Sequence, residues 1–430
     1  MRRVVVTGWG AIVPSPAGAG GFSEAVFEGR SAVRALSVQP AGSWPARAAA
    51  WIDDFEPRMH FTAGQLGNFD RTSQLAVVAT RLALAMAGLH GEASLQSAQH
   101  TSAAQPVAFN ADLDAERCGI HIGTGMGSAQ TMDAAYQRFY GEQSTRLKPL
   151  TVPTGMHNAA TAQVALETGF EGANITYCCA CASSAVAIGE AMRRIRHGDA
   201  DLMLCGGAEA LVIPSVAHVW EALRTLADVD PADPARSCKP FDANRSGLVL
   251  GEGACMFVLE SLEHAQARGA PILAELVGFA TGSDSVHLTR PSVEGQARAM
   301  RAALRDADLT AAQIGYINAH GTATAANDST EAAAIQAVFG ELATQPPVSS
   351  TKAVHGHLMG AAAAVELLVC LLALQQQRVP PTAHLQQVGD GCALDHVLGT
   401  ARSVPDLQAA MSNSFAFGGT TGVLILQRAT

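Results

Sequence analysis

One order of secondary-structure elements occurs twice along this chain of 430 residues, and no other feature restricts its fold as strongly. In the N-terminal part, a helix ending in MAGL precedes the strand-like run CGIHIGTGMGS, a cysteine-bearing turn and a long helix. In the C-terminal part, the helix RAMRAALRDADL precedes IGYINAHGTAT, the turn KAVHGHLMG and the apolar helix AAAAVELLVCLLALQQ. Such self-similarity predicts an internal duplication whose two packed halves share one site.

The predicted halves are residues 1–262 and 263–430, with the seam in SLEHAQARGA near 261–270. Strand-like runs such as VVVTG, ANITYCCA, DLMLCGG and ACMFVLE alternate with helix-like stretches, among them 73–87 and 183–197. This rhythm predicts an α/β fold built on a buried, largely parallel sheet.

Composition indicates a globular protein with a large core. The chain is 48% hydrophobic and 15% charged, the opposite of a disordered composition. Its net charge of -10 argues against nucleic-acid binding, and no apolar run reaches the ~20 residues of a membrane span.

The apolar run at 3–7 is short and meets a glycine, so we expect a first strand in a cytoplasmic protein rather than a signal peptide. Residues 91–114 lack periodicity and are predicted to be a loop insertion.

Cys181 is the candidate nucleophile. It follows the apolar run 175–179 and precedes small residues and a helix that Gly198 is placed to cap. A helix N-terminus favours the thiolate and offers backbone N–H groups to an oxyanion. A redox pair with Cys178 is the alternative, although Cys178 is expected on the strand, pointing into the sheet. A metal site is less favoured, because Cys178, Cys179 and Cys181 cannot converge on one ion from a strand.

Two histidines occupy equivalent turns of the second half. His320 follows the apolar run 314–317, and His357 precedes a long helix, with Lys352 five residues before it. Such turns lie beyond the carboxyl ends of strands, where α/β sheets place their sites. Either histidine alone would be more typical of a structural residue, but together they are predicted partners of Cys181. The other histidines are expected to be structural or surface residues.

Six ordered motifs resemble those of the β-ketoacyl-[acyl-carrier-protein] synthases of the I/II type. They are CACASSA at 179–185, GGAEA at 206–210, KPFDANRSGLVLGEGA at 239–254, HGTATAANDSTE at 320–331, STKAVHGHLMGAA at 350–362 and NSFAFGGT at 413–420. The resemblance covers nearly the whole chain apart from the insertion. It implies a Cys–His–His condensing enzyme with a thiolase-like fold, five layers αβαβα formed by two duplicated halves and assembled as a dimer.

The resemblance implies a decarboxylative Claisen condensation that needs no metal and no cofactor. Cys181 would take an acyl group from a phosphopantetheine thioester, with the oxyanion held by the backbone N–H groups of Cys181 and Phe417. Malonyl-acyl carrier protein would then lose CO2. His320 and His357 would donate their Nε2 protons to the resulting enolate, which attacks the acyl-cysteine to give a β-ketoacyl product.

Further roles follow from the same resemblance. Lys352 would be an electrostatic support paired with Glu331, and Asp328 a further supporting residue. Thr322 and Thr324 match positions that contact the pantetheine arm. The residues implied for the gating loop and the acyl pocket are Phe415, Phe417, Met126, Trp220 and Thr151.

The implied partner is an acyl carrier protein, and the implied assembly is a homodimer or a heterodimer with a chain-length-factor-like homologue. Arg146, Lys148 and Arg224 match basic docking positions. The Lys/Arg-rich stretch usual in the family is missing, because no Lys or Arg lies between Met59 and Asp70. The cluster at 193–196 is an additional docking candidate, although a solvated helix end is the simpler interpretation.

Several positions depart from the family pattern. His355, Thr421, Ala325 and Ala416 replace residues common there, and none removes a catalytic group. Thr151 matches a position where a bulky aromatic side chain often projects across the dimer, and the smaller threonine would leave room for a long or rigid acyl chain. We therefore expect a specialised synthase, for polyene or polyketide chains, rather than a housekeeping one.

Two rival functions remain within this fold. A non-catalytic chain-length partner would lack the nucleophile. A coenzyme A-dependent thiolase-like acyltransferase would need a second catalytic cysteine in the C-terminal half, and Cys370, inside an apolar helix, is a poor candidate.

Overall fold

The two halves of the chain form sheets with the same strand order. The computed structural model describes residues 1–16, 21–36, 47–89, 109 and 112–429. The first sheet has the order β5 (Asn174–Tyr177), β4 (Cys118–Gly123), β6 (Leu202–Ala210), β7 (Leu250–Ser261) and β1 (Val4–Ile12). The second has the order β10 (Val348–Ser349), β9 (Tyr316–Asn318), β13 (Ala409–Phe415), β14 (Thr420–Gln427) and β8 (Ala274–Ser283). A short antiparallel pairing of β1 with β8, at Val5–Glu275 and Val6–Ala274, joins the two sheets at one edge. The repeated topology confirms the predicted duplication.

The sheets are mixed rather than largely parallel. β4 runs parallel to β5 and β6, and β9 runs parallel to β10 and β13. β7 is antiparallel to β6 and β1, and β14 is antiparallel to β13 and β8. The expectation of a largely parallel sheet is therefore wrong for these strands. A continuous apolar run indicates that a strand is buried on both faces, not in which direction it runs. β7 is buried along its whole length although it is antiparallel to both of its neighbours, β6 and β1.

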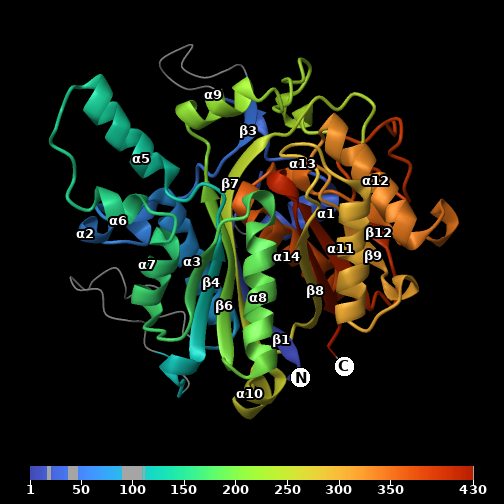
Figure 1. The fold of residues 1–430 in the computed structure, drawn as a ribbon, viewed down its shortest axis with the longest axis horizontal. Coiled ribbons are helices and arrows are strands. Elements are labelled where there is room, and N and C mark those ends of the chain that lie inside the picture. Colours follow the sequence, from blue (N-terminus) through green and yellow to red (C-terminus); the bar gives the residue numbers. More distant parts are fainter. Residues whose placement is uncertain (17–20, 37–46, 90–108, 110–111, 430) are drawn as a thin grey trace.

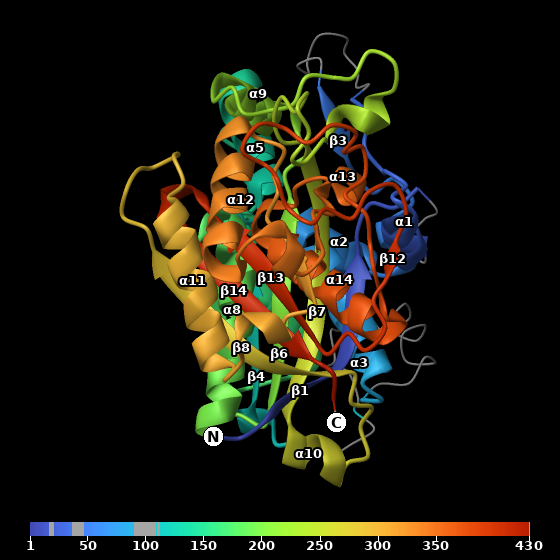
Figure 2. The same cartoon turned by 90° about the vertical axis from the view of Figure 1, so that its right-hand side faces the viewer.

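Helices separate and cover the two sheets, which gives five layers (Figures 1 and 2). In the middle layer, α8 (Ser183–His197) and α14 (Ala362–Gln376) contact each other and pack on the sheets to either side. On the outer faces, α3 (Arg71–Met86) and α7 (Ala159–Thr168) cover the first sheet, and α11 (Val293–Asp306), with α12 (Ala325–Phe339) beside it, covers the second. This arrangement is the αβαβα architecture expected from the sequence.

Shorter elements lie around these layers. The strands are β2 (Arg34–Ala35), β3 (Ala48–Ala50), β11 (Arg378–Val379) and β12 (Arg402–Ser403). The helices are α1 (Phe22–Glu28), α2 (Ala63–Leu66), α5 (Ala129–Tyr136), α6 (Thr151–Gly155), α9 (Pro214–Ala222), α10 (Leu262–Ala267) and α13 (Lys352–His355). α10 lies at the predicted seam between β7 and β8, and nearly all of the predicted insertion 91–114 falls outside the described residues.

The middle layer contains a long apolar helix that is almost fully buried. The segment Met359–Gln376, which contains α14, has a mean hydropathy of 1.7 and is 89% buried. Within the described residues it is the one helix long and apolar enough to pass for a membrane span. Its burial between two sheets identifies it as a core helix, since a helix that is apolar all round must be covered on every side.

Candidate active site

Cys181 lies in a short 3₁₀ turn, Ala180–Ala182, between β5 and α8. Its side chain is buried, and the Ser183 hydroxyl fixes the turn by accepting from the Cys179 backbone N–H at 2.8 Å. α8 follows at once and ends at Gly198, whose φ of 85° is the left-handed cap expected there. The prediction for Cys178 is wrong: β5 ends one residue earlier, so this side chain is exposed and its thiol meets the Gly125 carbonyl at 3.2 Å.

The structure brings Cys181 together with both predicted histidines. His357 Nε2 lies 3.2 Å from Cys181 Sγ, and the rings of His320 and His357 meet edge to face with centroids 5.4 Å apart. One side-chain atom from each of the three residues lies within 4.8 Å of the others. All three side chains are buried. Cys181 lies between β5 and α8, His320 between β9 and α12, and His357 between the short helix α13 and α14, so connecting segments of both halves converge on one site.

Hydrogen bonds to Nδ1 set the tautomer of each histidine. Lys352 Nζ lies 3.3 Å from His320 Nδ1, and the Met359 backbone N–H donates to His357 Nδ1 at 3.2 Å. Because Nδ1 accepts in both rings, the ring proton lies on Nε2. Burial, followed by the charge of Lys352, holds the pKa of both imidazoles well below the usual histidine value. The site therefore presents two neutral Nε2–H donors at neutral pH.

The same hydrogen bonds disfavour a metal ion. Cys181, His320 and His357 have a spacing that a metal could use. A histidine bound to metal through Nε2 normally donates its Nδ1–H to a carboxylate or carbonyl. Here Nδ1 of both rings faces a donor instead, so the surroundings fit hydrogen-bond donation by Nε2 and not metal ligation.

The environment of the thiol opposes ionisation more than expected. Burial raises the pKa of Cys181 to about 11, while Lys352 and the backbone N–H groups of Phe417 and Cys181 act in the opposite direction. The helix N-terminus is present, but desolvation of the buried thiol outweighs it. The two backbone donors that face the sulfur are those expected to hold an oxyanion.

A buried ion pair supports His320. Lys352 Nζ donates to the His320 carbonyl at 2.6 Å and pairs with Glu366 of α14, and Lys352 and Glu366 are fully buried. The predicted pair of Lys352 with Glu331 is wrong. Glu331 instead accepts from the backbone N–H groups of His320 and Gly321, at 2.8 Å each. Asp328, also buried, accepts from the Phe241 backbone N–H at 2.8 Å.

The triad opens into a cavity of about 280 Å³. Among its lining residues are Cys181, His320, His357, Thr322, Thr324, Trp220, Phe415 and Phe417. The indole of Trp220 stacks on Phe417, with ring centroids 6.0 Å apart. The turn Phe417–Gly419 is anchored to the loop between β8 and α11, because the Gly418 backbone N–H donates to the Leu288 carbonyl at 2.8 Å.

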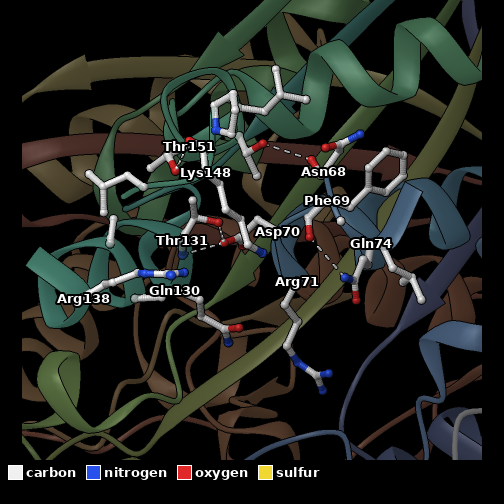
Figure 3. Close-up of a pocket in the computed structure, with 18 residues that line it drawn as sticks. Asn68, Phe69, Asp70, Arg71, Gln74, Gln130, Thr131, Arg138, Lys148 and Thr151 are labelled. Carbon is white, nitrogen blue, oxygen red and sulfur yellow. Dashed lines mark hydrogen bonds between the residues drawn. The ribbon is translucent and has the colours of Figure 1, made fainter. Parts of the chain in front are cut away.

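Two predicted pocket residues lie elsewhere. Met126 is partly exposed and does not line the catalytic cavity. Its backbone N–H donates to the carboxylate of Glu209. Thr151 lines a separate hollow of about 760 Å³ between the N-terminal end of α3 and the segment 130–154 (Figure 3). The resemblance places this residue where a side chain projects across the dimer, so its part in the acyl pocket stays a prediction.

The predicted docking residues also separate. Lys148 lines the hollow of Figure 3 together with Arg138, whereas Arg146 is exposed nearby. Arg224 lies between Leu223 and Thr225, both of which line the catalytic cavity. The arginines of the cluster at 193–196 form ion pairs with nearby acids, as at an ordinary helix end. The pairs are Arg193 with Glu190, Arg194 with Asp199 and Arg196 with Asp306.

Sequence reasoning missed two buried carboxylates. Glu366 was recognisable as the single charge in an otherwise apolar helix. Glu209 joins the two halves: its carboxylate accepts from the backbone N–H groups of Gly125, Met126 and Gly360. Burial raises its pKa to about 7 although these donors favour the charged form.

Comparison with protein families agrees with this architecture. The family described as beta-ketoacyl synthase, N-terminal domain, matches residues 1–265, and the one described as beta-ketoacyl synthase, C-terminal domain, matches residues 273–386. The chain belongs to the β-ketoacyl synthase family. It is thus a condensing enzyme, and the thiolase-like fold inferred from its motifs is confirmed.

Relatives of this synthase span its whole length. The 3-oxoacyl-[acyl-carrier-protein] synthase 2 of Coxiella burnetii is 36% identical over 429 residues, 99% of each chain. Nodulation protein E of Rhizobium meliloti is 38% identical over 427 residues, again 99% of each chain. A solved complex titled AntDE:AntF, a type II PKS acyl-carrier protein with its ketosynthase bound to the hexaketide, has a chain with a TM-score of 0.86 and 29% identity over the full length of both chains. The I/II type is therefore confirmed.

The rival functions find less support. Cys370 is fully buried in α14, with its thiol 3.7 Å from the Met411 carbonyl, so it offers no second catalytic thiol. A non-catalytic partner would lack the triad that this synthase assembles.

Proposed function

We propose that this synthase extends an acyl chain held on Cys181 by decarboxylative Claisen condensation with malonyl-acyl carrier protein. The observation that carries the proposal is the convergence of Cys181 Sγ with two neutral imidazoles, within 4.8 Å of one another, at the end of one cavity. A nucleophile beside two fixed N–H donors suits the formation of an acyl thioester followed by stabilisation of an enolate.

In the loading step, the Cys181 thiolate attacks the carbonyl carbon of an acyl-phosphopantetheine thioester. The oxyanion lies against the backbone N–H groups of Cys181 and Phe417, which already face the sulfur. The pantetheine thiolate leaves and takes the proton that Cys181 gave up. The acyl group remains on Sγ, and no electron is transferred to or from an external partner.

In the condensation step, the malonyl thioester loses CO2, and the electron pair of the broken bond forms an enolate. The Nε2–H groups of His320 and His357 hold the enolate oxygen, and the neutral state of both rings makes them donors rather than acids. The enolate carbon attacks the acyl carbonyl, and Cys181 leaves as thiolate. Lys352 is a positioning residue, since it orients His320 through Nδ1.

The pantetheine arm would reach Cys181 along Thr322 and Thr324, whose hydroxyls lie 2.9 Å apart in the cavity wall. Phe415, Phe417 and Trp220 would form the gate and the wall of the acyl pocket. No metal or resident cofactor enters the scheme, since decarboxylation drives the condensation. The chemistry belongs to both halves, 1–262 with the cysteine and 263–430 with the histidines.

The acyl carrier protein is the proposed partner, and the carrier in the AntDE:AntF complex supports it. Dimerisation is proposed through β5, which ends the first sheet, and the neighbouring segment 129–156. Large apolar side chains are exposed along that segment: Tyr136, Phe139, Tyr140, Leu147, Leu150, Val152 and Met156. Such a patch marks an interface, with a second copy or a chain-length-factor-like homologue, in a soluble cytoplasmic enzyme.

We also propose a specialised cargo, an oxygenated or polyene chain. The likeness to nodulation protein E and to a ketosynthase bound to a hexaketide supports this. Thr151 in place of a bulky side chain would leave room for such a chain where two subunits meet. Equal elongation of saturated chains of all lengths, with no preference for unsaturated or oxygenated ones, would count against it.

The test separates the two steps. His320→Ala and His357→Ala should each load an acyl group on Cys181 within about tenfold of the wild-type rate, yet lose condensation by about 10²-fold or more. Loading is followed by mass spectrometry and condensation by release of CO2 from malonyl-carrier protein. His218→Ala, which removes an exposed histidine of the short helix α9, is the matched control. Condensation at the wild-type rate in both variants would overturn the enolate assignment.

A further inference from the structure

Glu209 binds two segments that come from different halves of the chain. It lies near the end of β6, fully buried, and its carboxylate accepts four hydrogen bonds. Three donors belong to the segment 124–126: the Thr124 hydroxyl at 3.2 Å and the backbone N–H groups of Gly125 and Met126. The fourth donor is the backbone N–H of Gly360, at 2.9 Å. One side chain therefore bridges the N-terminal and the C-terminal half.

The first of these segments supports the turn that carries Cys181. The hydroxyl of Ser183, the first residue of α8, lies 3.1 Å from the Thr124 carbonyl. The same hydroxyl oxygen accepts from the Cys179 backbone N–H at 2.8 Å, on the other side of the turn. A shift of the segment 124–126 would therefore move Ser183, and Cys181 with it.

The second segment orients His357. Gly360 belongs to the 3₁₀ turn Met359–Ala361, and the Met359 backbone N–H donates to His357 Nδ1 at 3.2 Å. Met359 has a φ of 46°, a left-handed conformation that is unfavourable for a residue with a side chain. Strain of this kind persists only where neighbouring contacts impose it, and the bond from Gly360 to Glu209 is one such contact.

The two segments meet backbone to backbone. A Cβ on Gly360 would lie 2.2 Å from the Gly125 backbone nitrogen, so no side chain fits between them. The N–H groups of Gly125 and Gly360 both point to one oxygen, Oε2 of Glu209. Hydrogen bonds to a carboxylate are stronger than those between neutral groups, and two of them on one oxygen fix the separation of the segments.

We propose that Glu209 is a positioning residue that sets the 3.2 Å contact between Cys181 Sγ and His357 Nε2 by holding these two segments together. The inference rests on the proposed function, which gives the thiol the acyl chain and the imidazole the enolate oxygen. The enolate carbon must reach the acyl carbon on Sγ, so a displaced His357 would hold the nucleophile in the wrong place. Glu209 acts through Ser183 on one side and through Met359 on the other.

His320 provides an internal comparison, because other groups hold it. Lys352 Nζ lies 3.3 Å from its Nδ1, and Glu331 accepts from its backbone N–H at 2.8 Å. A change at Glu209 should therefore reach His357 but not His320. This difference separates the positioning of one pair from a general loosening of the core.

Double-mutant cycles on the full-length enzyme test the inference, with release of CO2 from malonyl-acyl carrier protein by the acyl-loaded enzyme as the readout. Glu209→Gln keeps the shape of the side chain but offers one acceptor oxygen in place of two. It should lower kcat about fivefold and leave KM for malonyl-acyl carrier protein unchanged. In the His357→Ala background the same change should have no further effect, because the contact that Glu209 sets is gone. In the His320→Ala background it should keep its fivefold effect.

Glu260→Gln is the matched control, since Glu260 is a buried carboxylate at the other pole of the first sheet, paired with Arg268. It should lower stability in urea without lowering kcat. Thr124→Val removes only the hydroxyl donor to Glu209. It should lower kcat less than Glu209→Gln does, with the same dependence on His357, and it decides the question if Glu209→Gln does not fold.

An equal loss of kcat on changing Glu209 in the wild-type, His357→Ala and His320→Ala backgrounds would overturn the inference, because the carboxylate would then support the core in general. An unchanged kcat in Glu209→Gln, or a change in KM alone, would overturn it as well. Failure of the acyl-loaded wild-type enzyme to release CO2 from malonyl-acyl carrier protein would instead refute the proposed function, which is a separate result.

Discussion

The ammonium of Lys352 lies 3.3 Å from Nδ1 of His320 and also binds the carbonyl of that residue at 2.6 Å. One buried cation therefore fixes both the orientation and the tautomer of a proposed enolate donor. It is itself neutralised by Glu366, in the helix that forms the centre of the molecule.

Lys352→Met should therefore damage condensation more than acyl loading. The imidazole of His320 would lose the donor that keeps its proton on Nε2, and we expect decarboxylation to fall about 10²-fold. The variant also leaves Glu366 unpaired in the core, at a cost of about 3–5 kcal/mol of stability. The double variant Lys352→Met/Glu366→Met should recover stability, measured by urea unfolding, without recovering decarboxylation. Recovery of both would make the pair merely structural.

The reactivity of Cys181 should keep rising with pH. Burial raises the pKa of this thiol to about 11, and only the thiolate is alkylated. The rate of Cys181 alkylation by iodoacetamide should increase nearly tenfold per pH unit from about pH 8 to about pH 10. Peptide mapping separates Cys181 from the exposed Cys178. A rate that levels off below about pH 8 would show that the donors around the sulfur outweigh its burial.

Glu209 should make stability depend on pH. Its folded-state pKa is raised to about 7, above the ordinary 4.5, so the folded protein binds this proton more tightly than the unfolded chain does. The contribution is complete below about pH 4.5 and is lost as pH rises to about 7, a change of about 3 kcal/mol. Glu209→Gln, which cannot ionise, should flatten that part of the profile in urea titrations. Parallel profiles for the two proteins would contradict the shift.

Gly123 should be intolerant of any side chain. A Cβ there would lie 2.2 Å from the Ser184 backbone nitrogen, in the first turn of α8. Gly123→Ala should displace that turn, lowering stability by about 1–3 kcal/mol and slowing the loading of Cys181. Gly64→Ala is the matched control, since nothing lies within 4 Å of its added methyl group. A normal loading rate in Gly123→Ala would mean that α8 does not set the position of the thiol.

Much of this architecture could be predicted from the sequence because it repeats. The duplication, the cap at Gly198 and the meeting of Cys181, His320 and His357 follow from short motifs at strand-to-helix turns. Strand direction could not be predicted, since apolar runs encode burial and not orientation.

Side-chain partners were harder to predict than positions. Lys352 was expected near Glu331, because both lie in motifs around the same histidines, yet its partner Glu366 comes from the core helix. Met126 was expected in the catalytic pocket, but an alignment does not say which way a side chain faces, and its backbone N–H binds the buried Glu209 instead. These contacts depend on how the middle layer packs, which no local pattern records.

The central claim, that Cys181 carries the growing chain, is tested most directly by mass spectrometry of the intact enzyme after incubation with an acyl-carrier donor. We predict a single acyl adduct that maps to Cys181, absent in Cys181→Ala and retained in Cys178→Ala. An adduct of equal yield in Cys181→Ala, or one that maps to Cys178, would contradict the claim.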